Sequence, residues 1–170
     1  MFNLYFIGRI ASNEARLLMR SWGFRIFSAL ALIILALANI GIISRGISTP
    51  YYISSLSGSL PLNSLKLFNI FQGIIVALVA TEFFKRDRKN DSIQVVFARS
   101  FSNVEYYLGK ALGILSVFLL LNLAVLILTF VFHFFFSSTI FALQPYFLYF
   151  LLICLPTLIF MIGLSFFLSS

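Results

Sequence analysis

The chain has too little charge for a soluble protein. Only 10% of its 170 residues are charged, and 61% are hydrophobic. A soluble domain is about half apolar and about a quarter charged. Such a sequence cannot cover a surface with polar groups. The composition therefore excludes an ordinary globular domain and predicts an integral membrane protein.

Catalytic and metal-binding patterns are missing as well. The one cysteine, Cys154, lies in an apolar run, so an intrachain disulfide is excluded and we expect this thiol to serve packing. The absence of a Gly-x-x-x-x-Gly-Lys-Ser/Thr loop excludes ATP hydrolysis by this chain itself. Neither a His-Glu-x-x-His motif nor a Cys/His cluster of metal-ligand spacing is present. We expect no enzyme, no metal site and no cofactor in this chain.

Four apolar segments are long enough to cross a bilayer as helices, which takes about 20 residues. They cover residues 26–43, 62–84, 111–136 and 146–167. Strand edges with unpaired backbone groups are excluded in hydrocarbon, and the alternation of apolar and polar residues that is typical of a membrane barrel is missing. The sequence predicts an all-α, polytopic membrane protein that forms one domain over residues 1–170.

The basic residues indicate an orientation. They gather before the first segment and between the second and third, which leaves only Arg45 and Lys66 for the other side. Lys and Arg are enriched in cytoplasmic loops. We therefore expect a cytoplasmic N-terminus in the inner (plasma) membrane and no nucleic-acid partner. A cleaved signal peptide is the rival interpretation, since residues 36–38 resemble a cleavage site, but the apolar run continues beyond them.

An amphipathic helix precedes the first segment. We expect residues 1–25 to lie in the membrane interface, with the tryptophan at headgroup depth and the arginines reaching anionic lipid. The alternative is a simple extension of the first span. The apolar stripe comprises Leu4, Ile7, Ala11, Leu18 and Trp22, and the polar side comprises Arg9, Asn13, Arg16 and Arg20.

Polar chemistry is concentrated in the loop 85–110. Asp91 with Gln94, and Ser102 with Glu105, have the spacing of helix-capping boxes. The first box predicts a short helix along the membrane surface. The second predicts a helix that runs straight into the third apolar segment.

The short helix carries three apolar residues between charges, Ile93, Val96 and Phe97. Such side chains favour either the bilayer or the groove of a partner protein. The alternative is that the basic residues of this loop serve only as topology signals.

Two further titratable residues lie near span ends. Glu82 can pair with Lys85 or Arg86 one turn on, and we expect that pairing rather than a role in gating. His133 lies near the end of the third segment, where we expect it to be solvated; the alternative is a functional group inside the membrane.

The stretch from Phe84 to Lys110 resembles the cytoplasmic loop of ABC transporter permeases of the ABC-type-2 exporter class. That loop has a charged run, then Gly-Thr/Ser-x-x-x-Leu, Arg-Pro-x-Ser and Glu-Tyr-x-x-Gly-Lys. Asp91 stands where Gly is common and Ser100 where Pro is common. The matching residues are Ser92, Arg99, Ser102, Glu105, Tyr106, Gly109 and Lys110.

The resemblance implies that residues 91–102 form a coupling helix on a separate ATP-binding cassette subunit, which would hold the ATP and Mg. It also implies a second permease copy or a paralogue, and about six spans, so we expect a longer permease that continues beyond this chain. The contacts with the ATPase would be Asp91, Ser92, Ile93, Val96, Phe97, Arg99 and Ser102, with Glu82, Glu105, Tyr106, Gly109 and Lys110 supporting the loop.

The expected function is a permease subunit that couples ATP hydrolysis by its partner to export of a substrate. A helix of some 34 residues from Asn103 would carry the motion into the membrane over about 50 Å. Because no polar cavity residues are evident, an amphiphilic or hydrophobic cargo is favoured. The alternative is a membrane anchor that docks a cytoplasmic protein without transport.

Overall fold

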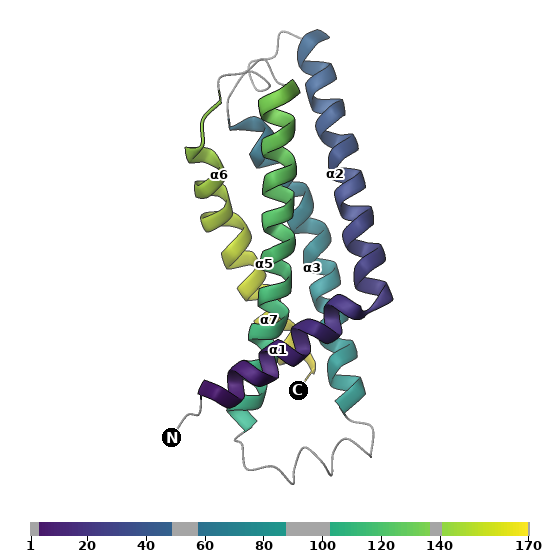
Figure 1. Cartoon of the computed structure of the whole chain (residues 1–170), viewed down its shortest axis with the longest axis vertical. Helices are drawn as coiled ribbons and strands as arrows, with labels where there is room; N and C mark the ends of the chain where they lie inside the picture. Colours follow the sequence, from purple (N-terminus) through teal and green to yellow (C-terminus); the bar gives the residue numbers. More distant parts are fainter. Residues whose placement is uncertain (1–3, 49–57, 88–102, 137–140, 170) are drawn as a thin grey trace.

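The computed structural model describes residues 4–48, 58–87, 103–136 and 141–169. Of these described residues 96% are helical and none forms a strand, which confirms the predicted all-α class. Figure 1 shows long helices running side by side and one helix, α1, lying obliquely across one end of the bundle. Both chain termini lie near this end, which we call the α1 end; the opposite end is the far end.

The helices match the predicted segments with shifted bounds. Among the described residues, four stretches are long and apolar enough to cross a membrane: Trp22–Gly41, Ser59–Val79, Val104–Phe136 and Gln144–Phe167. The chain is therefore a multi-pass membrane protein. The elements are α1 (Leu4–Arg20), α2 (Trp22–Ser48), α3 (Ser59–Asp87), α5 (Asn103–Phe136), α6 (Gln144–Tyr149), the π-helical turn η1 (Phe150–Cys154) and α7 (Leu155–Ser169).

A serine separates α1 from α2. The Ser21 hydroxyl donates to the Leu18 carbonyl at 2.9 Å and accepts the Phe24 backbone N–H at 3.3 Å. A serine that accepts a backbone N–H three residues on is a helix N-cap. The first membrane helix consequently begins at Trp22, earlier than the predicted residue 26.

The central helix is α5, which contacts α1, α2, α3 and α7. It runs unbroken for 34 residues, as the sequence predicts. Its buried side chains meet those of the surrounding helices in one apolar core, and Cys154 lies in that core as predicted. The core members on α5 are Ile114, Val117, Phe118, Leu121 and Val125.

The last membrane segment contains a π-helical turn that the hydropathy pattern does not reveal. Pro156 follows the turn Phe150–Cys154 and has no backbone N–H to donate, so the regular hydrogen-bond ladder must break here. The Ile153 carbonyl accepts the Thr157 hydroxyl at 2.6 Å and lies 3.5 Å from the Asn69 Nδ2 of α3. The segment thus offers a backbone acceptor to a neighbouring helix.

The expectation that His133 is solvated is wrong. Its side chain is only 2% exposed, and its Nδ1 lies 2.7 Å from the Tyr146 hydroxyl. The aromatic rings of Phe130 and Phe141 pack around the pair. Because α6 brings Tyr146 back against the end of α5, the imidazole finds a protein partner instead of water.

Candidate functional site

Two glycines let α1 approach α5 closely. A Cβ atom added at Gly109 would lie 2.7 Å from the Ile10 Cβ, and one at Gly113 would lie 2.8 Å from the Ala11 carbonyl oxygen. Both distances are far below van der Waals contact, so only glycine fits at these two positions. Small residues four apart are a common means of close helix packing in membranes.

An ion pair crosses the same contact. The Lys110 Nζ lies 3.8 Å from the Glu14 Oε1, and the two side chains are 1% and 8% exposed. The ammonium also lies 4.8 Å from the centre of the Tyr106 ring, which is cation–π distance. A charge in apolar surroundings is costly unless it is paired. The pair therefore fixes which face of α1 meets α5.

We call this contact the α1–α5 clamp. It brings together Tyr106, Gly109 and Lys110, three of the residues that the resemblance assigns to support of the loop. Glu105 is buried one turn closer to the start of α5. The clamp is made by Ile10, Ala11, Glu14, Tyr106, Gly109, Lys110 and Gly113.

The remaining predicted site residues are not placed by the structure. Glu82 belongs to α3, but its side chain is outside the described set. The predicted ATPase contacts also lie outside the described residues. They are Asp91, Ser92, Ile93, Val96, Phe97, Arg99 and Ser102.

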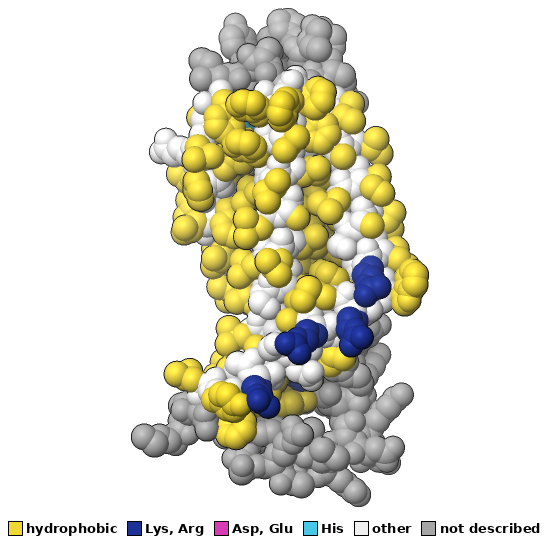
Figure 2. Space-filling view, viewed as in Figure 1, with side chains coloured by type: hydrophobic (Ala, Val, Ile, Leu, Met, Phe, Trp, Pro, Cys, Tyr) yellow, Lys and Arg dark blue, Asp and Glu magenta, His cyan; other side chains and the backbone are white. Residues whose placement is uncertain are grey.

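The apolar stripe predicted for the N-terminal helix is divided in the structure. Ile7 and Leu18 are buried against the bundle, whereas Leu4 and Trp22 are strongly exposed. The prediction did not include α5, against which the middle of the stripe packs. The arginines of α1 are exposed, and Figure 2 shows basic side chains gathered along α1 and the start of α2. An interfacial position for α1 stays a prediction.

A line of amide groups crosses the middle of the bundle. The Asn122 Nδ2 on α5 donates to the Gln72 Oε1 on α3 at 2.8 Å. The Gln72 Nε2 donates to the Asn69 Oδ1, and the Asn69 Nδ2 lies 3.5 Å from the Ile153 carbonyl of η1. This amide line links α5, α3 and the π-helical turn through side chains that lie within the apolar segments.

The amide line was not predicted from the sequence. Its members were available as a signal, because an Asn or Gln inside an apolar segment is rare and needs a partner. What the sequence did not show is that the amides of two separate segments, on α3 and α5, meet each other and the Ile153 carbonyl of a third segment. Asn39 and Ser64 form a second contact of this kind, at 2.9 Å between α2 and α3.

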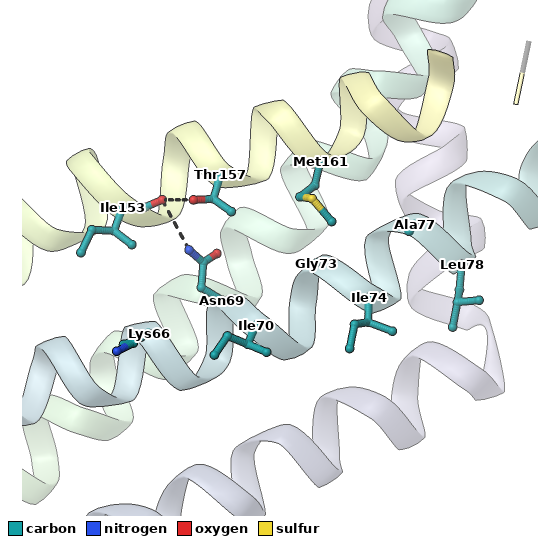
Figure 3. A pocket seen from close by; sticks show the side chains of 10 residues that line it. All are labelled: Lys66, Asn69, Ile70, Gly73, Ile74, Ala77, Leu78, Ile153, Thr157 and Met161. Carbon is teal, nitrogen blue, oxygen red and sulfur yellow. Dashed lines mark hydrogen bonds between the residues drawn. The ribbon is translucent and has the colours of Figure 1, made fainter. Parts of the chain in front are cut away.

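An open groove lies beside the amide line, between α3 and the η1–α7 segment. Its volume is about 710 Å³, and its wall is mostly apolar. Figure 3 shows Ile70, Ile74 and Leu78 in a row along α3, with Asn69 and Met161 reaching across from the two sides. Within the described residues, no group of three or more His, Cys, Asp or Glu side chains could hold a metal ion.

The chain therefore combines a tight clamp at the α1 end, an amide line in the middle and an open groove along α3. These features suit a protein that holds one end rigid and leaves another contact free to rearrange. No protein-family model, curated protein or solved structure matches this chain.

Proposed function

We propose that this chain is the membrane-spanning permease subunit of an ATP-binding cassette transporter, in which a separate subunit hydrolyses ATP and this chain moves a substrate outward. In this proposal the N-terminus lies in the cytoplasm of a cell whose inner membrane the chain spans. A second copy or a paralogue completes the path.

The observation that carries the proposal is the length and continuity of α5. A helix of 34 residues measures about 51 Å, whereas the hydrocarbon core is about 30 Å thick. One end must therefore project from the bilayer. Because the clamp holds the α1 end of this helix, a force applied there passes along α5 as through a rigid lever.

The resemblance supplies the source of that force. Residues 91–102, which precede α5, would dock on the cassette subunit, and closure of that subunit on ATP would push on the start of α5. The amide line joins α5 to α3 and η1, so the push would reach the contact beside the groove. This chain would position its helices and transmit the movement of the partner, and the partner would hold the nucleotide and Mg.

The proposal is tested by purifying the tagged full chain from membranes of its own cell. We expect a cassette ATPase to copurify and its turnover to be stimulated by the bound permease. The triple variant Ile93→Asp, Val96→Asp and Phe97→Asp should weaken this association at least tenfold, because burying carboxylates in an apolar docking surface is costly.

The matched control replaces three apolar residues at the same end of the bundle, Leu4, Tyr5 and Phe6, which are exposed on α1. Their triple Asp variant should leave the ATPase bound. If no cassette ATPase copurifies with the unmutated chain, the permease assignment fails. If docking is lost but export by the cell is unchanged, the chain is a static anchor.

A further inference from the structure

A lysine stands where the groove begins. Lys66 is exposed on α3 within the membrane segment Ser59–Val79. It lines the groove of about 710 Å³ beside η1 and α7, and also a hollow of about 390 Å³ that reaches Ala38 on α2. An ionisable residue inside a membrane segment is rare and usually has a partner or a function.

No acidic side chain pairs with this lysine in the part of the chain that the structure describes. The sequence has only five acidic residues. Glu82 and Asp87 are sixteen and twenty-one residues further along α3, which is about 24 and about 32 Å of helix, and Asp91 lies outside the described residues. Glu14 and Glu105 belong to α1 and the start of α5, at the α1 end. The ammonium can therefore meet an anion from outside the chain.

The groove has the length of one leaflet. From Lys66, the residues Ile70, Ile74 and Leu78 follow at successive turns toward the α1 end (Figure 3). Twelve residues of helix measure about 18 Å, and half of a hydrocarbon core is about 15 Å. Lys66 is the eighth residue of the segment Ser59–Val79, and a long lysine side chain near a helix end can extend toward the nearer headgroups. An apolar chain that starts there would lie beside this row over its whole length.

Gly73 gives the groove its depth. A Cβ atom added there would lie 3.1 Å from the Met161 Cε, so a larger residue would fill the space between α3 and α7. The row of isoleucine and leucine on α3 is exposed, which means that the groove opens toward the surroundings of the bundle. In a membrane those surroundings are lipid.

We propose that the groove binds one anionic phospholipid, with the phosphate at Lys66 and one acyl chain between α3 and α7. The two arguments are the charge of Lys66, which is complementary to the phosphate, and the apolar length of the groove, which is complementary to the chain. The site concerns binding alone, and it does not depend on the permease proposal.

The lysine should make the site selective for headgroup charge. One basic residue near a bilayer surface contributes about 1 kcal/mol toward anionic lipid, which corresponds to a roughly fivefold preference. The apolar part of the groove meets the same acyl chain in every phospholipid. An anionic lipid should therefore bind about fivefold better than a zwitterionic lipid with identical chains.

A pair of tryptophan reporters tests the site. Trp22 is the only native tryptophan, and Trp22→Phe removes its signal. In that background, Ile74→Trp places a reporter in the groove and Leu120→Trp places one outside it. Ile74 and Leu120 are 58% and 59% exposed. Each lies two residues toward the α1 end from the hydrogen-bonded Gln72 and Asn122, so the two reporters share a depth.

Each full-length variant is reconstituted in phosphatidylcholine bilayers that contain a minor fraction of phosphatidylglycerol with brominated acyl chains. Bromine quenches tryptophan fluorescence on contact. We expect the Ile74→Trp reporter to sense about a fivefold higher local fraction of the brominated lipid than the Leu120→Trp reporter. With brominated phosphatidylcholine instead, both reporters should follow the bulk composition.

Substitution of the lysine separates charge from shape. Lys66→Gln should make the two reporters equal, and Lys66→Arg should keep the enrichment, with circular dichroism confirming the helix content of each variant. Equal quenching at both reporters in the presence of Lys66 overturns the proposal. So does enrichment that survives Lys66→Gln, or that is as large for phosphatidylcholine. Weaker quenching at Ile74→Trp than at Leu120→Trp would mean that another protein copy covers the groove, which also overturns it.

Discussion

The α1–α5 clamp and the contact between α3 and α7 are both helix contacts that contain polar groups, yet they are built in opposite ways. In the clamp, α1 lies directly on the backbone of Gly109 and Gly113, and a buried ion pair fixes the register. Between α3 and α7, side-chain amides span the gap and a groove of about 710 Å³ remains beside them.

This contrast shows where the protein can rearrange. Backbone-to-backbone packing leaves no space for sliding, and a buried charge cannot change partners without a large penalty. Hydrogen bonds between membrane helices contribute only about 0.6 kcal/mol on average, because the separated helices find other partners. We therefore expect the α1 end to be rigid and the contact between α3 and α7 to be adaptable.

The largest expected effect comes from breaking the ion pair of the clamp. Lys110→Met removes the ammonium that faces the buried Glu14 carboxylate, and such a loss typically costs about 3–5 kcal/mol. The measurement is the free energy of unfolding in mixed micelles with increasing dodecyl sulfate. Lys66→Met, at an exposed lysine, is the matched control and should change it little. Equal losses in the two variants would refute the clamp as a special contact.

A smaller effect is expected from adding one methyl group at the clamp. Gly109→Ala forces a Cβ into the Ile10 side chain and should destabilise the chain by about 1–3 kcal/mol. Gly8→Ala is the control, since a Cβ there meets nothing within 4 Å, and it should be neutral or stabilise the helix by up to about 1 kcal/mol. The measurement is again the free energy of unfolding in mixed micelles. An unchanged value for Gly109→Ala would contradict the close approach of α1 to α5.

The smallest effect is expected at the amide line. A double-mutant cycle of Gln72→Leu and Asn122→Leu should give a coupling energy of about 0.6 kcal/mol. A control cycle pairs Asn122→Leu with Asn39→Leu, whose hydrogen bonds go to other residues, and its coupling should be near zero. A coupling above about 3 kcal/mol at the amide line would remove the contrast with the clamp, because this contact would then be rigid too.

The membrane helices could be predicted from the sequence, and their contacts could not. Uninterrupted apolar runs of this length have few alternatives to helix in hydrocarbon, and the 34 residues of α5 follow from a helix start at Asn103 that continues into the third run. The predicted coupling residues between 91 and 102 stay a prediction. The apolar stripe predicted for the N-terminal helix is divided in the structure, because Ile7 and Leu18 are buried against the bundle whereas Leu4 and Trp22 are exposed, and the interfacial position of this helix stays a prediction.

His133 illustrates the same limit from the polar side. Its place near the end of a span suggested water as its partner, and the structure supplies Tyr146 instead. The tyrosine is thirteen residues away along the chain, on a different helix, and nothing in the local pattern connects the two. The amides of α3 and α5 were equally visible in the sequence, but their meeting depends on how the helices are rotated about their axes.

The sequence is enough to predict that this chain is helical, that four stretches suit a bilayer and that its basic residues gather toward one side. Hydropathy decides these features because it depends only on the local content of apolar groups. Only the packing of the helices shows that Lys110 faces Glu14, that α1 lies against two glycines and that a lysine lies at one end of an open groove. Lipid and protein interiors are equally apolar, so hydropathy cannot tell which face of a helix packs against another helix and which face meets lipid. Only the packing in three dimensions distinguishes these faces.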